Sequence, residues 1–273
     1  LIFRRNVMEH TSEFNTKLEK ACQKKEALFD ESKMRYALRS MFAGAFLTMS
    51  TAAGAHAAQI IAGLNPALSR FTFAFIFTWG LVYVVFLNGE LATSNMMFLT
   101  AGAYQKHIKW SKAIAILFYC TLFNLVGAMF IGALFANSSA FNGINANEFI
   151  AKVAELKLSR SNELILLEGI LANVFVNVAI LSFILIKSEE AKLWIVISAI
   201  FMFVYLVNEH VVANFASFSI VKFSPVGNSI DALNWLNIIR HWAVSFVGNW
   251  IGGGILIGLA YAFLNRTKTS YVD

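Results

Sequence analysis

The sequence predicts an all-α integral membrane protein in which six transmembrane helices form two inverted repeats of three. First, 58% of the 273 residues are hydrophobic and only 14% are charged, whereas a soluble domain is about 25% charged. Second, the apolar residues gather in six long runs that carry few or no charges. Third, polar motifs of the first three runs recur in the last three in the same order.

The six runs divide the chain into three parts. Each run exceeds the roughly 20 apolar residues that cross a bilayer. Residues 1–35 are expected to form a cytoplasmic amphipathic helix, 36–264 the six-span transmembrane domain, and 265–273 a cytoplasmic C-terminal tail. The runs are 41–64, 71–103, 110–135, 164–186, 193–221 and 242–264.

The N-terminal segment places apolar side chains on one face of a helix, at Val7, Phe14, Leu18, Cys22 and Phe29. This pattern leaves two interpretations open. The helix lies on the membrane surface or on the mouth of a pore, or it is a solvated helix packed on a neighbouring subunit.

The basic residues set the predicted orientation. With the N-terminus inside, the cytoplasmic segments carry 16 Lys and Arg residues and the external segments six. Loops rich in Lys and Arg stay on the cytoplasmic side, so both termini are expected in the cytoplasm. The membrane is expected to be the inner membrane. Because these residues lie at the ends of the runs, the net charge of +6 does not indicate a nucleic-acid partner.

Three pairs of features recur between the two halves. A repeat of three spans must be inverted in the membrane, and such proteins bind their substrate near the midplane, between the halves. The pairs are Gly44 with Gly169, Asn124 with Asn249, and the motif E-x4-N from Glu90 to Asn95 with the same motif from Glu209 to Asn214.

The second and fifth runs are interrupted by this motif. At 33 and 29 residues they overshoot the bilayer core, so we expect two broken helices. Thr93, Ser94 or Asn95 is expected to cap the second half of one, and Asn214 that of the other. Both half-helix N-termini then point positive dipole ends at the midplane, which favours an anion. Next to Glu209, His210 adds a group that titrates near neutral pH.

With these features the chain resembles the formate/nitrite transporter family, in particular its bacterial members. The stretches EHVVAN, NGELATSN and GNWIGGG carry the resemblance, which covers roughly residues 36–264. It implies an aquaporin-like fold, a homo-oligomer expected to be a pentamer, and a channel or proton-linked transporter of small monovalent anions. Formate and nitrite are the expected substrates, with lactate as a further candidate. No cofactor and no enzymatic activity are expected.

The resemblance also implies roles for individual residues. His210 is the central pore histidine, Thr93 its partner, Asn249 the residue that orients the imidazole, Asn173 a polar lining residue, and Lys157 the lysine that attracts the anion from outside. Ser94 and Asn214 complete the expected pore set. The expected apolar constrictions are Phe77, Leu81, Leu91, Ala92, Val176 and Phe203. The family usually has an aromatic residue where this chain has Ala92, which suggests a wider slit.

Two other classes of protein share part of this pattern, an aquaporin-type facilitator and an intramembrane enzyme. An aquaporin-type facilitator of neutral solutes has the same architecture, but its Asn-Pro-Ala loops are absent, since the only prolines are Pro66 and Pro225. An intramembrane enzyme built on Glu209 and His210 lacks an accompanying nucleophile, base and orienting group. The sequence also lacks an H-E-x-x-H motif or a Cys/His cluster, so no metal site is expected.

Overall fold

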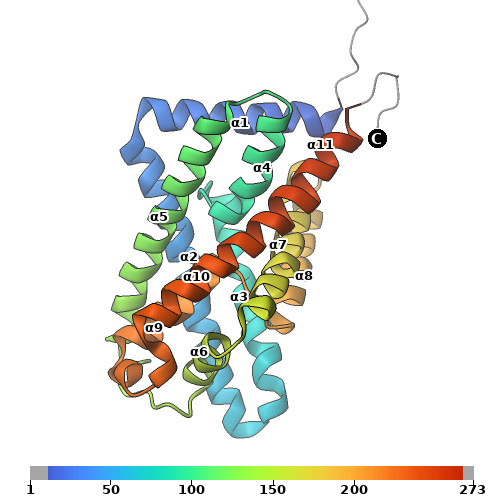
Figure 1. The fold of residues 1–273 in the computed structure, drawn as a ribbon. Coiled ribbons are helices and arrows are strands. Elements are labelled where there is room, and N and C mark those ends of the chain that lie inside the picture. Colours follow the sequence, from blue (N-terminus) through green and yellow to red (C-terminus); the bar gives the residue numbers. More distant parts are fainter. Residues whose placement is uncertain (1–11, 267–273) are drawn as a thin grey trace, which may run out of the picture.

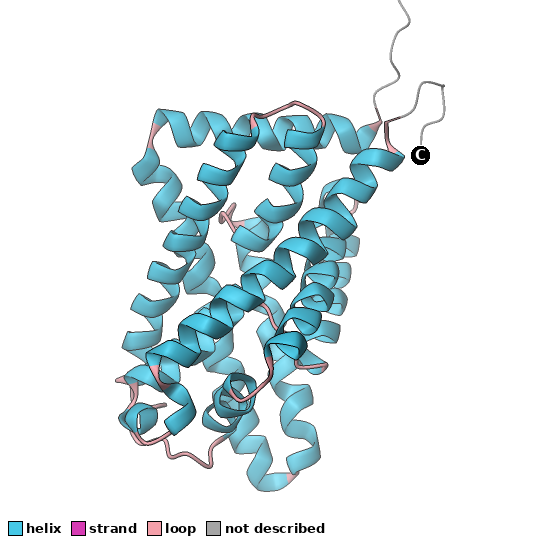
Figure 2. Cartoon of the chain, in the orientation of Figure 1, coloured by secondary structure: helices cyan, strands magenta, loops and turns pink. Residues whose placement is uncertain are grey.

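The computed structural model describes residues 12–266, and every regular element in that range is a helix (Figure 1, Figure 2). Val7, the rest of 1–11 and the end of the C-terminal tail, 267–273, lie outside the described residues. The α-helices are α1 (Glu13–Glu31), α2 (Lys33–Leu64), α3 (Pro66–Phe86), α4 (Ala92–Tyr104), α5 (Trp110–Ala136), α6 (Phe149–Leu158), α7 (Asn162–Leu185), α8 (Glu189–Tyr205), α9 (Val211–Phe223), α10 (Trp235–Asn249) and α11 (Ala260–Leu264). Two short 3-10 helices, η1 (Pro225–Asn228) and η2 (Asp231–Leu233), follow α9, and the segment η3 (Trp250–Leu259) is π-helical.

Four helices in the described range are long and apolar enough to cross a membrane. They are α3, α5, α7 and the continuous helix Trp235–Leu264, which α10, η3 and α11 form together. The expected span at 41–64 lies within the longer and less apolar α2, and the expected span at 193–221 is divided between α8 and α9. The run at 71–103 is also divided, between α3 and α4.

The elements recur in the same order in both halves of the chain. A short helix (α1, α6) precedes a long helix (α2, α7), then two helices separated by a few residues (α3 and α4, α8 and α9), then a long helix (α5, and α10 to α11). Figure 1 shows α1 lying across one end of the bundle and α6 at the other end. The two short helices therefore cover opposite ends of the molecule.

Glycines allow the long helices of each half to approach closely. A Cβ atom at Gly44 of α2 would lie 2.0 Å from the backbone oxygen of Asn124 of α5. In the second half, a Cβ at Gly252 would lie 2.1 Å from the backbone oxygen of Ile170 of α7. Because no side chain fits at these distances, α5 packs directly on α2 and the C-terminal helix directly on α7. Gly44 and Gly252 are therefore close-packing residues.

The apolar face of α1 packs on the bundle of its own chain. Phe14, Leu18, Cys22 and Phe29 are buried, and the Cys22 thiol lies 3.4 Å from the backbone oxygen of Phe98 in α4. Burial raises the pKa of Cys22 to about 11. The apolar face of α1 is therefore covered by its own chain, and the two interpretations left open stay predictions.

Candidate functional site

Two short connections, 87–91 between α3 and α4 and 206–210 between α8 and α9, have the same backbone structure. In each, one residue adopts a positive φ, 56° at Asn88 and 61° at Val207. The next N–H then bonds back into the preceding helix, from Gly89 to the Val84 oxygen at 2.8 Å and from Asn208 to the Phe203 oxygen at 3.1 Å. This six-residue loop-back is the Schellman motif that ends helices. α3 and α8 therefore end in the same C-terminal capping motif.

One asparagine holds each connection to a long helix. The Asn124 side chain accepts from the Ala92 N–H at 2.8 Å and donates to the Glu90 oxygen at 2.8 Å. The Asn249 side chain accepts from the Val211 N–H at 2.8 Å and donates to the Glu209 oxygen at 2.7 Å. Each amide therefore fixes the backbone on both sides of one residue, which is Leu91 in the first half and His210 in the second.

Each connection also carries a buried glutamate paired with a lysine from the short helix of its half. Lys25 of α1 lies 2.6 Å from the Glu90 carboxylate, and Asn95 donates to the same oxygen at 3.2 Å. Lys157 of α6 lies 2.8 Å from the Glu209 carboxylate, and Asn214 donates to it at 2.8 Å. The E-x4-N motif is thus a structural unit in which the asparagine and a lysine from outside the motif satisfy the buried acid.

The second carboxylate has further partners. Arg160 bonds to Glu209 and also to Glu168. The imidazole of His241, which is fully buried, lies 3.4 Å from Glu209. A buried charge is costly unless it is paired, so this network is what allows Glu209 to stay ionised at 0% exposure.

The connection residues and the first turn of α4 bring Thr93 and His210 together. The Thr93 hydroxyl lies 2.8 Å from Nε2 of His210, and both side chains are buried. The other ring nitrogen, Nδ1, accepts the backbone N–H of Ala213 at 3.1 Å and so caps α9. Because Nδ1 uses its lone pair there, a neutral ring carries its proton on Nε2 and donates it to Thr93. The hydroxyl hydrogen of Thr93 is then free to point elsewhere.

Two asparagines of α7 hold the backbone of Thr93. Asn173 and Asn177 each donate to the Thr93 backbone oxygen at 3.2 Å. Asn173 also donates to the Asn249 oxygen at 2.7 Å. Thr93 is therefore fixed through its main chain by α7, and its hydroxyl is left to the imidazole.

A hollow lies on each side of this pair. The first, of about 110 Å³, is lined by Phe77 and Phe203 together with Lys157 and Asn214. The second, of about 180 Å³, is lined by residues of α1, by the 87–91 connection and by Ser94. Along α3 the first hollow extends from Arg70 to Phe77, and the second begins at Val84, seven residues or about 10 Å further along the helix.

Aromatic rings close the first hollow towards the histidine. The rings of Phe77 and Phe203 meet edge to face with centroids 6.0 Å apart, and the Phe203 ring lies 5.7 Å from the His210 ring. The aromatic rings of Phe77 and Phe203 thus form an apolar neck between the first hollow, whose polar side chains include Lys157 and Asn214, and the threonine–histidine pair.

A sequence profile of the formate/nitrite transporter family matches residues 12–263. The chain belongs to this family. It is therefore a multi-pass membrane protein, and its all-helical structure is the fold of the family's solved channels.

Individual relatives agree. The chain is 26% identical over 249 residues to the "Uncharacterized transporter YwcJ" of Bacillus subtilis (strain 168), covering 91% of this chain and 96% of that protein. It is 32% identical over 192 residues to the "Formate channel BtFdhC" of Bacillus thuringiensis, covering 68% of this chain and 70% of that protein.

Solved structures have the same fold. An "FNT family ion channel" matches with a TM-score of 0.85 at 24% identity, over 91% of this chain and 97% of that chain. A "Pentameric formate channel with formate bound" matches with a TM-score of 0.74 at 20% identity, over 87% of this chain and 99% of that chain.

The structure shows the contacts of several residues whose expected roles in the formate/nitrite transporter framework stay predictions. Asn249 bonds to the backbone around His210 and not to its imidazole. Asn173 uses its amide on the Thr93 and Asn249 oxygens, so it is a support of the site. Lys157 is buried in an ion pair with Glu209 and also lines the first hollow; its role in attracting the anion stays a prediction.

The expected helix caps also differ. α4 begins at Leu91 without a side-chain cap, and α9 is capped by His210 in place of Asn214. The Ser94 hydroxyl donates to the Leu91 oxygen at 2.9 Å. Of the expected constriction residues, Phe77 and Phe203 line the first hollow, and Leu81, Leu91, Ala92 and Val176 are buried.

Sequence reasoning missed the charged groups that support the glutamates. These are Lys25 and Tyr36 at Glu90, and Arg160 and His241 at Glu209. A lysine in the short helix before each repeat, Lys25 and Lys157, is the signal that was available. Because Lys25 and Lys157 lie outside the expected spans, the repeat within the spans does not reveal that they correspond.

Proposed function

We propose that this chain carries small monovalent anions of weak acids across the inner membrane, linked to protons through His210. Formate and nitrite are the principal substrates, and lactate is a further one. The single observation that carries the proposal is the buried contact between Thr93 and His210, 2.8 Å apart, between two hollows that open towards opposite ends of the bundle.

The proposal includes the arrangement of the chain in the membrane. Six spans cross the bilayer in two inverted repeats, and α3 with α4, and α8 with α9, act as broken spans. The termini are cytoplasmic, and five copies assemble around a central axis. In support, irregular backbone at membrane depth is tolerated where it is buried in protein, and both connections have their polar groups bonded to Asn124 and Asn249.

The breaks favour an anion at the polar pair. α4 and α9 begin there, and a helix N-terminus carries a partial positive charge. Lys157 and Lys25 add positive charge near the two hollows, although each is paired with a glutamate. An anion is attracted into a hollow and meets the apolar neck, which it crosses most easily as a neutral acid because a bare ion pays a desolvation cost of several kcal/mol.

The proton transfer involves both ring nitrogens. A proton adds to Nδ1 of His210, which has the lone pair, and the ring gives up its bond from the Ala213 N–H. The charged ring then passes its Nε2 proton through the Thr93 hydroxyl to the anion. The carboxylate or nitrite becomes the neutral acid, and the ring is left neutral with its remaining proton on Nδ1; return of that proton to Nε2 restores the starting tautomer and the bond from the Ala213 N–H. The supports of Thr93 and of the backbone around His210 keep the two groups in reach.

The test is uptake into proteoliposomes of labelled formate, nitrite and lactate, with and without a pH gradient. His210→Phe is expected to abolish proton-coupled uptake while leaving oligomer assembly intact, and His210→Asn to keep passive anion conductance. His56→Phe is the matched control, because His56 is exposed on α2, away from both hollows. Normal acidification of vesicles by His210→Phe would refute the proton relay. Rapid glycerol uptake without a pH response would favour the neutral-solute facilitator instead.

A further inference from the structure

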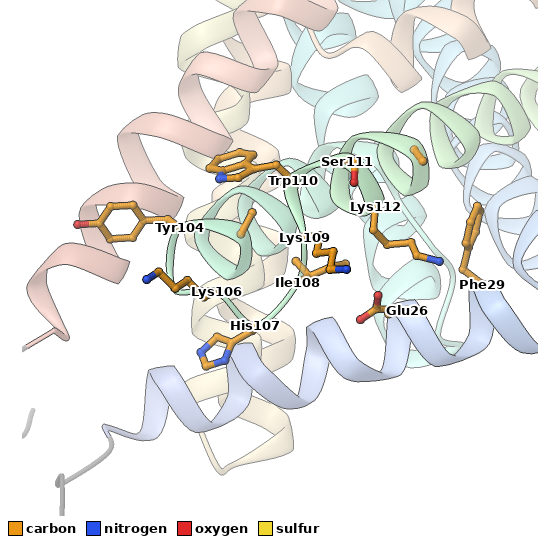
Figure 3. Close-up of a pocket in the computed structure, with 12 residues that line it drawn as sticks. Glu26, Phe29, Tyr104, Lys106, His107, Ile108, Lys109, Trp110, Ser111 and Lys112 are labelled. Carbon is orange, nitrogen blue, oxygen red and sulfur yellow. The ribbon is translucent and has the colours of Figure 1, made fainter.

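A large hollow lies outside the proposed pathway, at the end of the bundle where α1 crosses it. The hollow has a volume of about 1010 Å³ and lies between α1 and the connection from α4 to α5. Figure 3 shows Lys106, His107, Lys109 and Lys112 around it, with Glu26 of α1 on the facing wall. Among the side chains in its lining that carry a full charge, three are lysines and one is a glutamate.

Two of these lysines have no counter-ion in the described part of the chain. Lys112 pairs with Asp30 of α1 at 2.5 Å. Within residues 12–266, no carboxylate lies within ion-pair distance of Lys106 or Lys109, and Glu26 is the single acid in the lining. Lys106 is also held in a turn, with φ 67°, by the bond from the His107 N–H to the Gly102 oxygen at 2.8 Å. The two positive charges are thus presented by a fixed loop.

An apolar groove adjoins this basic hollow. It has a volume of about 350 Å³ and runs between α4, α5 and the C-terminal helix, lined by Leu99, Ile114, Phe118 and Phe246. Trp110 lines both the groove and the basic hollow. Phe118 and Ile114 are 60% and 50% exposed, so the groove is open on the side that faces away from the bundle.

We propose that the basic hollow and the groove form one binding site for an anionic phospholipid. Its phosphate binds between Lys106 and Lys109, and an acyl chain lies along the groove past Trp110. Tryptophan is enriched where membrane meets water, and clusters of Lys and Arg next to a span attract anionic lipids. The first turn of α5 adds N–H groups, since Lys109 provides no side-chain cap there.

The charge distribution favours a lipid over a second copy of the chain. An apolar groove alone would suit a contact between protomers. Covering the adjoining hollow with protein would bury two lysines without partners, which is strongly unfavourable. A phospholipid supplies both the missing negative charge and an apolar chain. The site lies outside the anion pathway, so its existence does not depend on the transport proposal.

The experiment is native mass spectrometry of the full, delipidated protein in mild detergent. It is titrated with phosphatidylglycerol and with phosphatidylcholine of identical acyl chains. Each lysine near a membrane surface is worth about fivefold in binding an anionic lipid, so two are worth about thirtyfold. Wild type is expected to prefer phosphatidylglycerol by at least tenfold, and the double variant Lys106→Ala/Lys109→Ala to lose that preference.

Two controls separate the site from general charge and from free phosphate. The double variant Lys20→Ala/Lys187→Ala removes two exposed charges that lie outside both hollows, and it is expected to keep the preference. Phosphatidylglycerol with six-carbon chains and glycerol 3-phosphate are expected to bind at least tenfold more weakly than the long-chain lipid.

Three results would overturn the proposal. One is an unchanged preference in the Lys106→Ala/Lys109→Ala variant, or an equal loss in its control. Another is binding of glycerol 3-phosphate as tight as that of the long-chain lipid, which would make the site a phosphate site. The last is efficient disulfide formation between protomers carrying Trp110→Cys and Phe118→Cys in the presence of saturating lipid, which would assign the groove to a subunit contact.

Discussion

Replacing Gly253 by alanine is expected to disturb the site through the two amides that hold Thr93. A Cβ atom at Gly253 would lie 2.2 Å from the side-chain nitrogen of Asn173 and 2.4 Å from that of Asn177. Both nitrogens donate to the Thr93 backbone oxygen. The methyl group cannot enter unless these amides move, so Gly253→Ala acts on Thr93 without changing any residue that faces the pathway.

The magnitude follows from the contacts. Two hydrogen bonds are worth about 0.5–1.5 kcal/mol each, and overpacking adds about 1–3 kcal/mol. Alanine recovers up to about 1 kcal/mol of helix propensity relative to glycine. The expected net destabilisation is therefore about 1–5 kcal/mol. Loss of one hydrogen-bond equivalent at the anion site corresponds to formate uptake that is roughly threefold to tenfold lower.

The assays are thermal denaturation of the purified oligomer and formate uptake per folded oligomer in vesicles. Gly63→Ala is the matched control, because a Cβ at Gly63 of α2 meets nothing within 4 Å, and it is expected to match or slightly exceed wild type in stability. In an Asn173→Ala/Asn177→Ala background, Gly253→Ala is expected to have little further effect, because its targets are gone. A Gly253→Ala protein that melts and transports like wild type would refute the reasoning.

Four other perturbations follow from the structure. Val207→Asn is expected to raise the free energy of unfolding by about 1 kcal/mol, because a β-branched residue is strained at positive φ (φ is 61° here); an unchanged melting temperature would contradict this. Lys157→Met is expected to cost about 3 kcal/mol or more in chemical denaturation, since it breaks a buried ion pair, and a loss below 1 kcal/mol would show that Arg160 suffices for Glu209. Ala92→Phe is expected to reduce lactate uptake more than formate uptake in the same vesicles, and equal losses would argue against a size filter at this position. Cys22 is expected to react slowly with maleimide at pH 8, because at a pKa of about 11 only about one Cys22 side chain in a thousand is a thiolate. Leu18→Asp should detach α1 and is expected to speed the labelling of Cys22 at least tenfold. Equal labelling rates would mean that α1 does not protect the thiol.

The repeat explains why much of the fold could be predicted from the sequence. The connections at Glu90 and Glu209, the close packing at Gly44 and the proximity of Thr93 to His210 each depend on short motifs. The residues of these motifs act locally or on a neighbouring helix. Hydrophobic runs locate helices because a bilayer span must be apolar. For these features, position along the chain already carries the information.

Hydrogen-bond direction could not be predicted in the same way. Asn249 occupies the expected place, but its amide is directed to the main chain at Glu209 and Val211, which depends on side-chain rotamers. Arg160 and His241 reach Glu209 from elements outside the motif, and tertiary packing alone brings them there. The π-helical stretch Trp250–Leu259 was also missed, since its i to i+5 bonding has no simple composition signal.

The pairing of each buried glutamate with a lysine has a consequence for how the chain enters the bilayer. Lys25 precedes Glu90 by 65 residues, and Lys157 precedes Glu209 by 52. A polypeptide inserted from its N-terminus therefore always synthesises the cation before the acid. When Glu90 or Glu209 leaves the ribosome, the lysine that pairs with it has already been synthesised. Neither carboxylate therefore has to enter the lipid phase without a counter-ion. The order of charges along the chain thus makes a counter-ion available before each buried acid is synthesised.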